Sequence, residues 1–177
     1  MADAETLERR EVPLADWATA VADARDAAYT FFDWLTAVDE SDAEENPGFD
    51  IVCHLMDGST PGALRRVLIR ARVPDGSPVP SITGIFAGAA WHERETHEMF
   101  GIDFEGFDDG TGLGIRPLLL PDGFEGTPLR KSFVLAARAS KPWPGAWTRR
   151  RPPVVLVCSL SPGSLAPGVP GPEWGPR

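Results

Sequence analysis

The segment His92-Glu-Arg-Glu-Thr-His97 holds the residues best suited to chemistry, two histidines with carboxylates between them. A zinc hydrolase helix places its two histidines four positions apart, with a glutamate next to the first, so that both imidazoles share one face. The spacing here is five, which turns the second imidazole by about 140° from the first at roughly 100° per residue. The third histidine, His54, stands far away in the sequence. The spacing therefore argues against a zinc hydrolase site.

Other catalytic patterns fail on their spacing as well. A calcium loop that began at Asp103 would need a glutamate at its twelfth position, where Gly114 stands. The glycine-rich segment 110–114 has no dinucleotide-binding or Walker pattern, and no serine lies in a G-x-S-x-G frame. Cys53 and Cys158 are isolated, so they cannot build an iron–sulfur or zinc site. We therefore expect no catalytic, cofactor-binding or metal-binding residues in this chain.

Charged side chains crowd the segment from 91 to 100. Glu93, Arg94 and Glu95 could form a solvated face, a polar protein–protein contact or an intramolecular hub of ion pairs, and composition leaves these open. We predict a hub of charge-assisted hydrogen bonds that fixes this segment against the turn at Phe100 and Gly101. The apolar residues that bracket the charges are expected to be buried: Trp91, Met99 and Phe100.

The elements that would position these residues can be predicted from hydrophobic spacing. Apolar residues at helical intervals predict an amphipathic helix from about Pro13 to about Tyr29, and the aromatic and β-branched residues that follow predict a strand. Alternating patterns over 49–55 and 67–73 predict an antiparallel hairpin with one wet face. The side chains expected to meet on that face are Asp50, Arg66, Arg70 and Arg72.

A second helix is predicted over Ala89–Phe100, ended by Gly101. Beyond it the chain has the composition of loop and turn. Residues 140–177 carry 9 of the 18 prolines and cannot pair their backbone in a helix or central strand. We expect this tail to be disordered or laid in extended form over a partner.

Charge and hydropathy exclude further classes of protein. The net charge is −9, with an acidic first third and a basic C-terminal region, which argues against general nucleic-acid binding. The acidic part serves either solubility or the docking of a partner. No apolar run approaches the roughly 20 residues that span a bilayer, and the N-terminus lacks the regions of a signal peptide. We expect a protein that stays in the reducing cytoplasm.

Two spaced motifs resemble one family. The segments Trp91–Gly106 and Ile115–Phe133 are similar to the E-R-E-x-x-D-M-F-G-I and L-x-P-x-x-W-E-G-x-P-L-R-K-D patterns of the C subunit, the 30 kDa-type subunit, of bacterial NADH-quinone oxidoreductase, respiratory complex I. The residues that match are Glu93, Arg94, Glu95, Met99, Phe100, Gly101, Ile102, Glu125, Gly126, Pro128, Leu129, Arg130 and Lys131. Segments 35–39 and 79–83 also look like the family.

The chain departs from the family pattern at several positions. Glu98 stands in place of aspartate, Phe124 in place of tryptophan, and Ser132 in place of aspartate. The family's H-P-D-x-R-R segment is replaced by residues 107–117, with Arg116 as its remnant. These departures concern the details of the contact with a partner.

The resemblance implies an α+β domain over residues 1–135, with a largely antiparallel sheet and flanking helices, followed by an extended proline-rich tail over 136–177. It implies a non-catalytic, peripheral subunit on the cytoplasmic face of the cell membrane, next to subunits D and B, which touches the membrane only through the complex. The iron–sulfur clusters, FMN and quinone would belong to partner subunits in an assembly that oxidises NADH, reduces quinone and translocates protons. This chain would brace the D subunit, which holds the quinone site and is called the quinone-site subunit below.

The matching residues, together with Trp91, would then serve structure or subunit contacts. We expect Arg130 and Lys131 to be presented outward after Pro128, and residues 128–160 to lie extended over the quinone-site subunit. A frayed terminus without a role is the alternative for the part after Ser140.

Two other functions remain open. The equivalent subunit of a membrane-bound [NiFe] hydrogenase or formate hydrogenlyase shares this domain, and the missing H-P-D-x-R-R segment leaves room for it. A free-standing enzyme would need a nucleophile–base or metal set, which the sequence does not offer.

Overall fold

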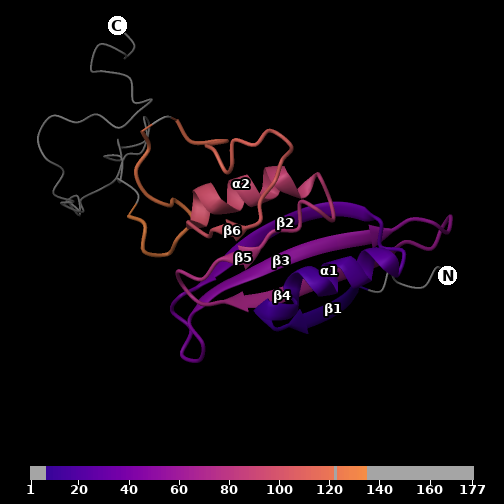
Figure 1. Ribbon diagram of the computed structural model, residues 1–177. Helices are drawn as coiled ribbons and strands as arrows, with labels where there is room; N and C mark the ends of the chain where they lie inside the picture. Colours follow the sequence, from indigo (N-terminus) through magenta and orange to yellow (C-terminus); the bar gives the residue numbers. More distant parts are fainter. Residues whose placement is uncertain (1–6, 122, 135–177) are drawn as a thin grey trace, which may run out of the picture. The chain divides into compact units, whose positions relative to one another are not determined.

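The computed structural model describes residues 7–121 and 123–134, and the predicted tail over 136–177 lies outside these ranges. The described part contains four longer strands, two short strands, two helices and a 3-10 turn at Leu14–Asp16 (Figure 1). The elements are β1 (Leu7–Val12), α1 (Trp17–Asp26), β2 (Phe31–Glu40), β3 (Gly48–Asp57), β4 (Arg65–Val73), β5 (Val79–Pro80), α2 (Ala89–Phe100) and β6 (Phe104–Glu105).

The main sheet has the order β1-β4-β3-β2. Neighbours β2–β3 and β3–β4 are antiparallel, which confirms the predicted hairpin, and Cys53 lies opposite Leu35 on one side and Ile69 on the other. The edge strand β1 runs parallel to β4, and the short strands β5 and β6 form a separate parallel pair. The predicted α+β class with a largely antiparallel sheet is confirmed, whereas β1 was not predicted from the sequence.

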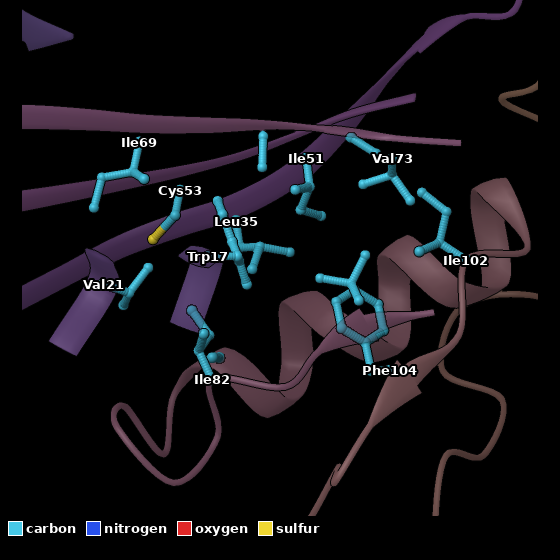
Figure 2. Packing of buried hydrophobic residues seen from close by; sticks show 14 of the residues in the cluster. Trp17, Val21, Leu35, Ile51, Cys53, Ile69, Val73, Ile82, Ile102 and Phe104 are labelled. Carbon is cyan, nitrogen blue, oxygen red and sulfur yellow. The ribbon is translucent and has the colours of Figure 1, made fainter. Parts of the chain in front are cut away.

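The core lies between one face of the sheet and the two helices. Figure 1 shows α1 beside β4 and α2 beside β2, and the elements of each pair are in contact. Figure 2 shows side chains of the strands pointing towards those of α1 and of the segments around Ile82 and Phe104. Trp17 and Val21 of α1 are fully buried, as are Ile69 of β4 and Ile82. Burial of apolar surface of this extent is the main stabilising term of such a domain.

The first helix is shorter than its hydrophobic spacing predicts. It begins at Trp17, after the 3-10 turn, and ends at Asp26 rather than at Tyr29. Ala28 has a left-handed φ of 81°, and the Tyr29 amide donates to the carbonyl of Ala24, as in a Schellman cap. The chain therefore turns before Tyr29, whose buried ring packs in the core.

Two of the predicted arginines on the outer face of the hairpin form ion pairs with Asp50. Asp50 on β3 contacts both Arg70 at 3.3 Å and Arg72 at 2.7 Å, on β4. Within the described residues, neither helix has the length and apolar content to cross a membrane.

Candidate functional site

Helix α2 has the bounds that the sequence predicts. It spans Ala89–Phe100 and stops where Gly101 adopts a left-handed φ of 70° and its amide donates to the carbonyl of His97 at 2.7 Å. A glycine is favoured here because it takes this conformation without steric strain. A Cβ at position 101 would also stand 3.1 Å from the methyl group of Thr127, so the glycine lets a later segment approach the helix end.

Glu93 points into the interior of the domain. Its side chain is fully buried, and its two oxygens accept hydrogen bonds from the Ile82 amide and the Ser81 hydroxyl, both at 2.7 Å. Burial raises the pKa of Glu93 to about 7, and these two hydrogen bonds oppose the rise. Both partners are neutral, so Glu93 ties α2 to the loop after β5 without an ion pair.

Arg94 and Glu98 hold the segment that passes over α2. The Arg94 guanidinium donates to the carbonyl of Arg116 at 3.1 Å and to that of Pro117 at 2.7 Å. The Glu98 carboxylate accepts from three successive amides, those of residues 118, 119 and 120, at 3.2, 2.8 and 3.0 Å. Partial burial raises the pKa of Glu98, but the three donors and the charge of Arg94 outweigh it and lower that pKa. Two side chains one helical turn apart therefore fix five consecutive backbone units.

The predicted hub of Glu93, Arg94 and Glu95 is wrong. Neighbouring residues on a helix point in different directions, so Glu93 faces the core, Arg94 faces the passing segment and Glu95 is exposed. Trp91, expected to be buried, is 63% exposed, with the Arg94 guanidinium 5.5 Å from its ring centroid. Phe100 is buried, as predicted, whereas Met99 is only partly buried.

Residues 125–131 fold back onto the domain. The Leu129 amide donates to the carbonyl of Met99 at 3.1 Å, and the Arg130 guanidinium donates to the carbonyl of Phe100 and lies 4.8 Å from the ring centroid of Phe49. The Lys131 amide donates to the carboxylate of Asp39 at 2.6 Å.

The expected outward presentation of this segment is therefore wrong for Arg130, whose guanidinium is turned inward and also pairs with Asp75. The Lys131 ammonium stays at the surface but is paired with Asp42.

We call residues 107–121 and 123–134 the loop segment, since they contain no helix or strand. Its backbone is held by the side chains described above, while several of its large apolar side chains face outward. A groove of about 370 Å³ lies between it and α2, with His97, Ile115 and Leu120 in its walls. The exposed large apolar residues on and beside the loop segment are Trp91, Leu113, Leu119, Phe124, Leu129 and Val134.

The two histidines of α2 contact different parts of the chain. Nδ1 of His92 lies 3.1 Å from the carbonyl oxygen of Leu35, and Nδ1 of His97 lies 3.0 Å from the carbonyl oxygen of Ile102. Across residues 7–121 and 123–134, no group of three or more histidine, cysteine or acidic side chains is arranged to hold a metal ion. Cys53 is buried in the core, and burial raises the pKa of its thiol well above the ordinary value. The two histidines and Cys53 therefore make contacts within the domain.

Sequence reasoning did not find the partners of three members of this site. Ser81 and Asp39 stood in segments that match the family, and Glu98 stood among the charged residues of the helix, where the family has aspartate. Their partners lie 12, 92 and about 20 positions away in the chain, so spacing could not reveal them. The one local signal was the pair of hydroxyl residues Ser81 and Thr83, because such hydroxyls often bond to backbone or carboxylate groups in turns.

An α+β domain whose helix holds a long irregular segment with outward apolar side chains has the form of an interaction module. The chain belongs to the family of the 30 kDa subunit of respiratory-chain NADH dehydrogenase, whose family model matches residues 10–139. This match confirms the resemblance seen in the two motifs.

Curated relatives carry a matching name. The C subunit of the NADH-quinone oxidoreductase of Mesorhizobium japonicum is 44% identical over 87 residues, which cover 49% of this chain and 39% of that protein. The protein of the same name from Rhizobium rhizogenes is 41% identical over 110 residues, covering 62% of this chain and 51% of its own length. The chain thus spans about half or less of the length of these relatives.

Solved structures share the fold. A trypsin-resistant fragment of Nqo5 superposes with a TM-score of 0.51 at 24% identity, covering 62% of this chain and 86% of the fragment. A chain of the membrane-bound sulfane sulfur reductase, an archaeal respiratory membrane complex, superposes with a TM-score of 0.62 at 21% identity, covering 81% of this chain and 86% of that chain. At these identities the likeness concerns the fold alone.

Proposed function

We propose that the chain is a non-catalytic peripheral-arm subunit of a proton-translocating NADH-quinone oxidoreductase, where it braces the quinone-site subunit. It would sit on the cytoplasmic face of the membrane next to subunits D and B, without membrane contact or nucleic-acid binding of its own. Iron–sulfur clusters, FMN and quinone would be held by partner subunits. The family and the names of its relatives support this function over a hydrogenase or formate hydrogenlyase complex.

The anchored loop segment is the observation that carries the proposal. Arg94 and Glu98 hold its backbone through hydrogen bonds to main-chain groups, and its own Arg130 donates to the carbonyl of Phe100 at the end of α2. Leu119 is nevertheless 58% exposed and Leu129 54%. A segment that is ordered before binding loses less conformational entropy when a partner docks. Large apolar side chains held outward in a fixed arrangement are typical of the buried centre of a protein–protein interface.

Copurification with the quinone-site subunit tests this function. The full chain, coexpressed with that subunit from the same organism, is compared with its Leu119→Glu and Leu129→Glu variants. Each places a charge in the proposed contact and should lower the recovery of the quinone-site subunit by roughly tenfold or more. Thr19→Glu, on the exposed surface of α1, adds the same charge elsewhere and should leave the recovery unchanged. Wild-type recovery with both leucine variants would refute the contact.

The tail is tested separately. We propose that residues 128–160 continue over the quinone-site subunit, and the part beyond 134 lies outside the described residues. Versions of the chain that end at Phe133 and at Ser140 should recover less of the quinone-site subunit than the full chain. If both shortened versions recover as much, the tail is dispensable for this contact.

A further inference from the structure

A chain of hydrogen bonds leads from the core of the domain to the start of the loop segment. The Asp108 amide donates to Oγ1 of Thr83 at 3.2 Å. The hydroxyl oxygens of Thr83 and Ser81 lie 2.8 Å apart, and the Ser81 hydroxyl donates to Oε2 of Glu93 at 2.7 Å. Glu93 is fully buried and Thr83 is 7% exposed, so these two side chains have little access to water that could replace a lost partner.

The direction of this chain is fixed while Glu93 is ionised. A hydroxyl group has one hydrogen and two lone pairs. The hydrogen of Ser81 points to the Glu93 carboxylate, so the hydrogen of the Thr83 hydroxyl must point to Ser81. Oγ of Ser81 also accepts from the Thr83 amide at 3.2 Å. Each hydroxyl hydrogen then has an acceptor, and the bonds all point to the negative charge, an alignment in which each bond strengthens the next.

Protonation of Glu93 reverses the chain. The Ile82 amide donates to Oε1 of Glu93 at 2.7 Å, so the added proton is held on Oε2, where Oγ of Ser81 can accept it. Ser81 then uses its two lone pairs for Glu93 and the Thr83 amide, and its own hydrogen turns to Oγ1 of Thr83.

The Thr83 hydroxyl is the group that loses by this reversal. In the part of the chain that the structure describes, this hydroxyl has hydrogen bonds with Ser81 and with the Asp108 amide only, so its hydrogen is left without an acceptor. An unsatisfied donor at a buried position is unfavourable. We therefore expect the Thr83 side chain to turn when Glu93 is protonated, which weakens its bond to Asp108.

We propose that this chain is a pH-sensitive switch in which ionised Glu93 fixes the start of the loop segment at Asp108 and protonated Glu93 releases it. The anchors that hold residues 116–120 do not involve Glu93, so the switch acts on the first part of the loop segment. A partner that holds this part in place favours the ionised form, because linkage between two equilibria is reciprocal.

Both forms of Glu93 are populated near neutral pH. Burial raises the pKa of Glu93 to about 7, and its two hydrogen bonds oppose the rise. Cys53 on β3 is the titratable side chain that interacts with it from the sheet, and burial raises the pKa of this thiol well above its ordinary value, so it stays neutral.

The other charged groups around Glu93 do not share its proton. The two histidines of α2 contact carbonyl groups, and the charged side chains of α1 are exposed or paired. The charged side chains of β2, of α2 next to Glu93 and of the segment around β6 are bonded to other groups or exposed: Asp33, Asp39, Arg94, Glu95, Asp103 and Glu105.

Amide resonances of the ¹⁵N-labelled full chain test the switch. The Ile82 amide donates directly to Glu93 and reports its ionisation, whereas the Asp108 amide reports the far end of the chain of hydrogen bonds. Both should titrate between pH 5.5 and 8 with the same midpoint. Protection of the Asp108 amide from hydrogen exchange, corrected for the intrinsic rate at each pH, should be roughly two- to tenfold lower when Glu93 is protonated. Titration of Ile82 without Asp108, or of neither amide, would overturn the proposal.

Variants of Thr83 separate the chain of hydrogen bonds from an effect of charge through space. Thr83→Val keeps the shape of the side chain but not its hydroxyl, so Ile82 should still titrate and Asp108 should not. Thr83→Ser keeps the hydroxyl and should retain the titration of Asp108. Equal titration of Asp108 in folded Thr83→Val and in the wild type would mean that the hydroxyl does not carry the signal, and the proposal would fail.

Glu93→Gln imitates the protonated form, because its NH₂ group can donate to Ser81 while its oxygen accepts from the Ile82 amide. In this variant the Asp108 amide should keep the low-pH resonance of the wild type at every pH, a test that needs no change at Thr83. Titration of Asp108 that persists in Glu93→Gln would assign it to another group and refute the switch. None of these measurements involves a partner, so their failure would leave the proposed contact with the quinone-site subunit unaffected.

Discussion

Replacing Glu93 by glutamine removes the one carboxyl group that is fully buried in the core of the described domain. Burial raises the pKa of Glu93 from 4.5 to about 7, so the folded chain binds this proton more strongly than the unfolded chain does. The group therefore contributes stability that is fully present below about pH 4.5 and is lost as the pH rises through about 7. Glutamine keeps the shape and an acceptor oxygen for the Ile82 amide but does not titrate.

The magnitude follows from the size of the shift. One pKa unit corresponds to about 1.4 kcal/mol, so the shift from 4.5 to about 7 is worth about 3 kcal/mol in total. Between pH 5.5 and 8 the proton-linked loss of unfolding free energy is about 2 kcal/mol. For a domain with a total stability of about 5–15 kcal/mol, such a change is readily measured.

The assay is urea unfolding of the full chain, followed by the fluorescence of its tryptophans, at several pH values from 5.5 to 8. From pH 5.5 to 8, the free energy of unfolding of the wild type should fall by about 2 kcal/mol more than that of Glu93→Gln. Glu95→Gln, two positions along the same helix and exposed, should keep the wild-type pH dependence. If Glu93→Gln shows the same slope as the wild type, then Glu93 does not carry the buried proton and the reasoning is refuted.

Three further predictions concern single positions and the whole chain. Arg94→Ala leaves the carbonyls of Arg116 and Pro117 without their donor, so it should lower the free energy of unfolding in urea by about 1–3 kcal/mol. Arg25→Ala is the control, and an equally small change in both variants would contradict the prediction. Gly48→Ala puts a Cβ 2.3 Å from the carbonyl oxygen of Val73 and should lower the melting temperature by several degrees, while Gly58→Ala, with nothing within 4 Å, should not. The purified chain should show no visible absorption band, and stoichiometric iron or flavin in it would disprove the absence of cofactors.

The parts of the fold that the sequence predicted are those set by local rules. Apolar and polar residues alternate along β3 and β4, and α2 ends at a glycine, Gly101. Both patterns involve residues that are close in the chain. Strand β1 could not be predicted in this way, because Leu7–Val12 is mostly charged and pairs with β4 more than fifty positions later.

The candidate site shows the same division. The family motifs pointed to Glu93, Arg94 and Arg130. They did not indicate which groups these side chains contact. The directions of Glu93 and Arg94 depend on which elements pack against each side of α2, and the inward turn of Arg130 depends on a free carbonyl at the end of that helix. Such contacts are tertiary, and neither composition nor spacing contains them.

The parallel pairing of β1 with β4 has a consequence for biosynthesis. Leu7 leaves the ribosome long before Arg66, its partner in the register, and at about 5–20 residues per second the delay is roughly 3–12 seconds. Throughout this interval the first strand has no ladder to join, and the apolar side of α1 has no sheet to cover it. The nascent chain therefore emerges for several seconds before β1 and α1 can pack on β4, the strand with which both make their contacts.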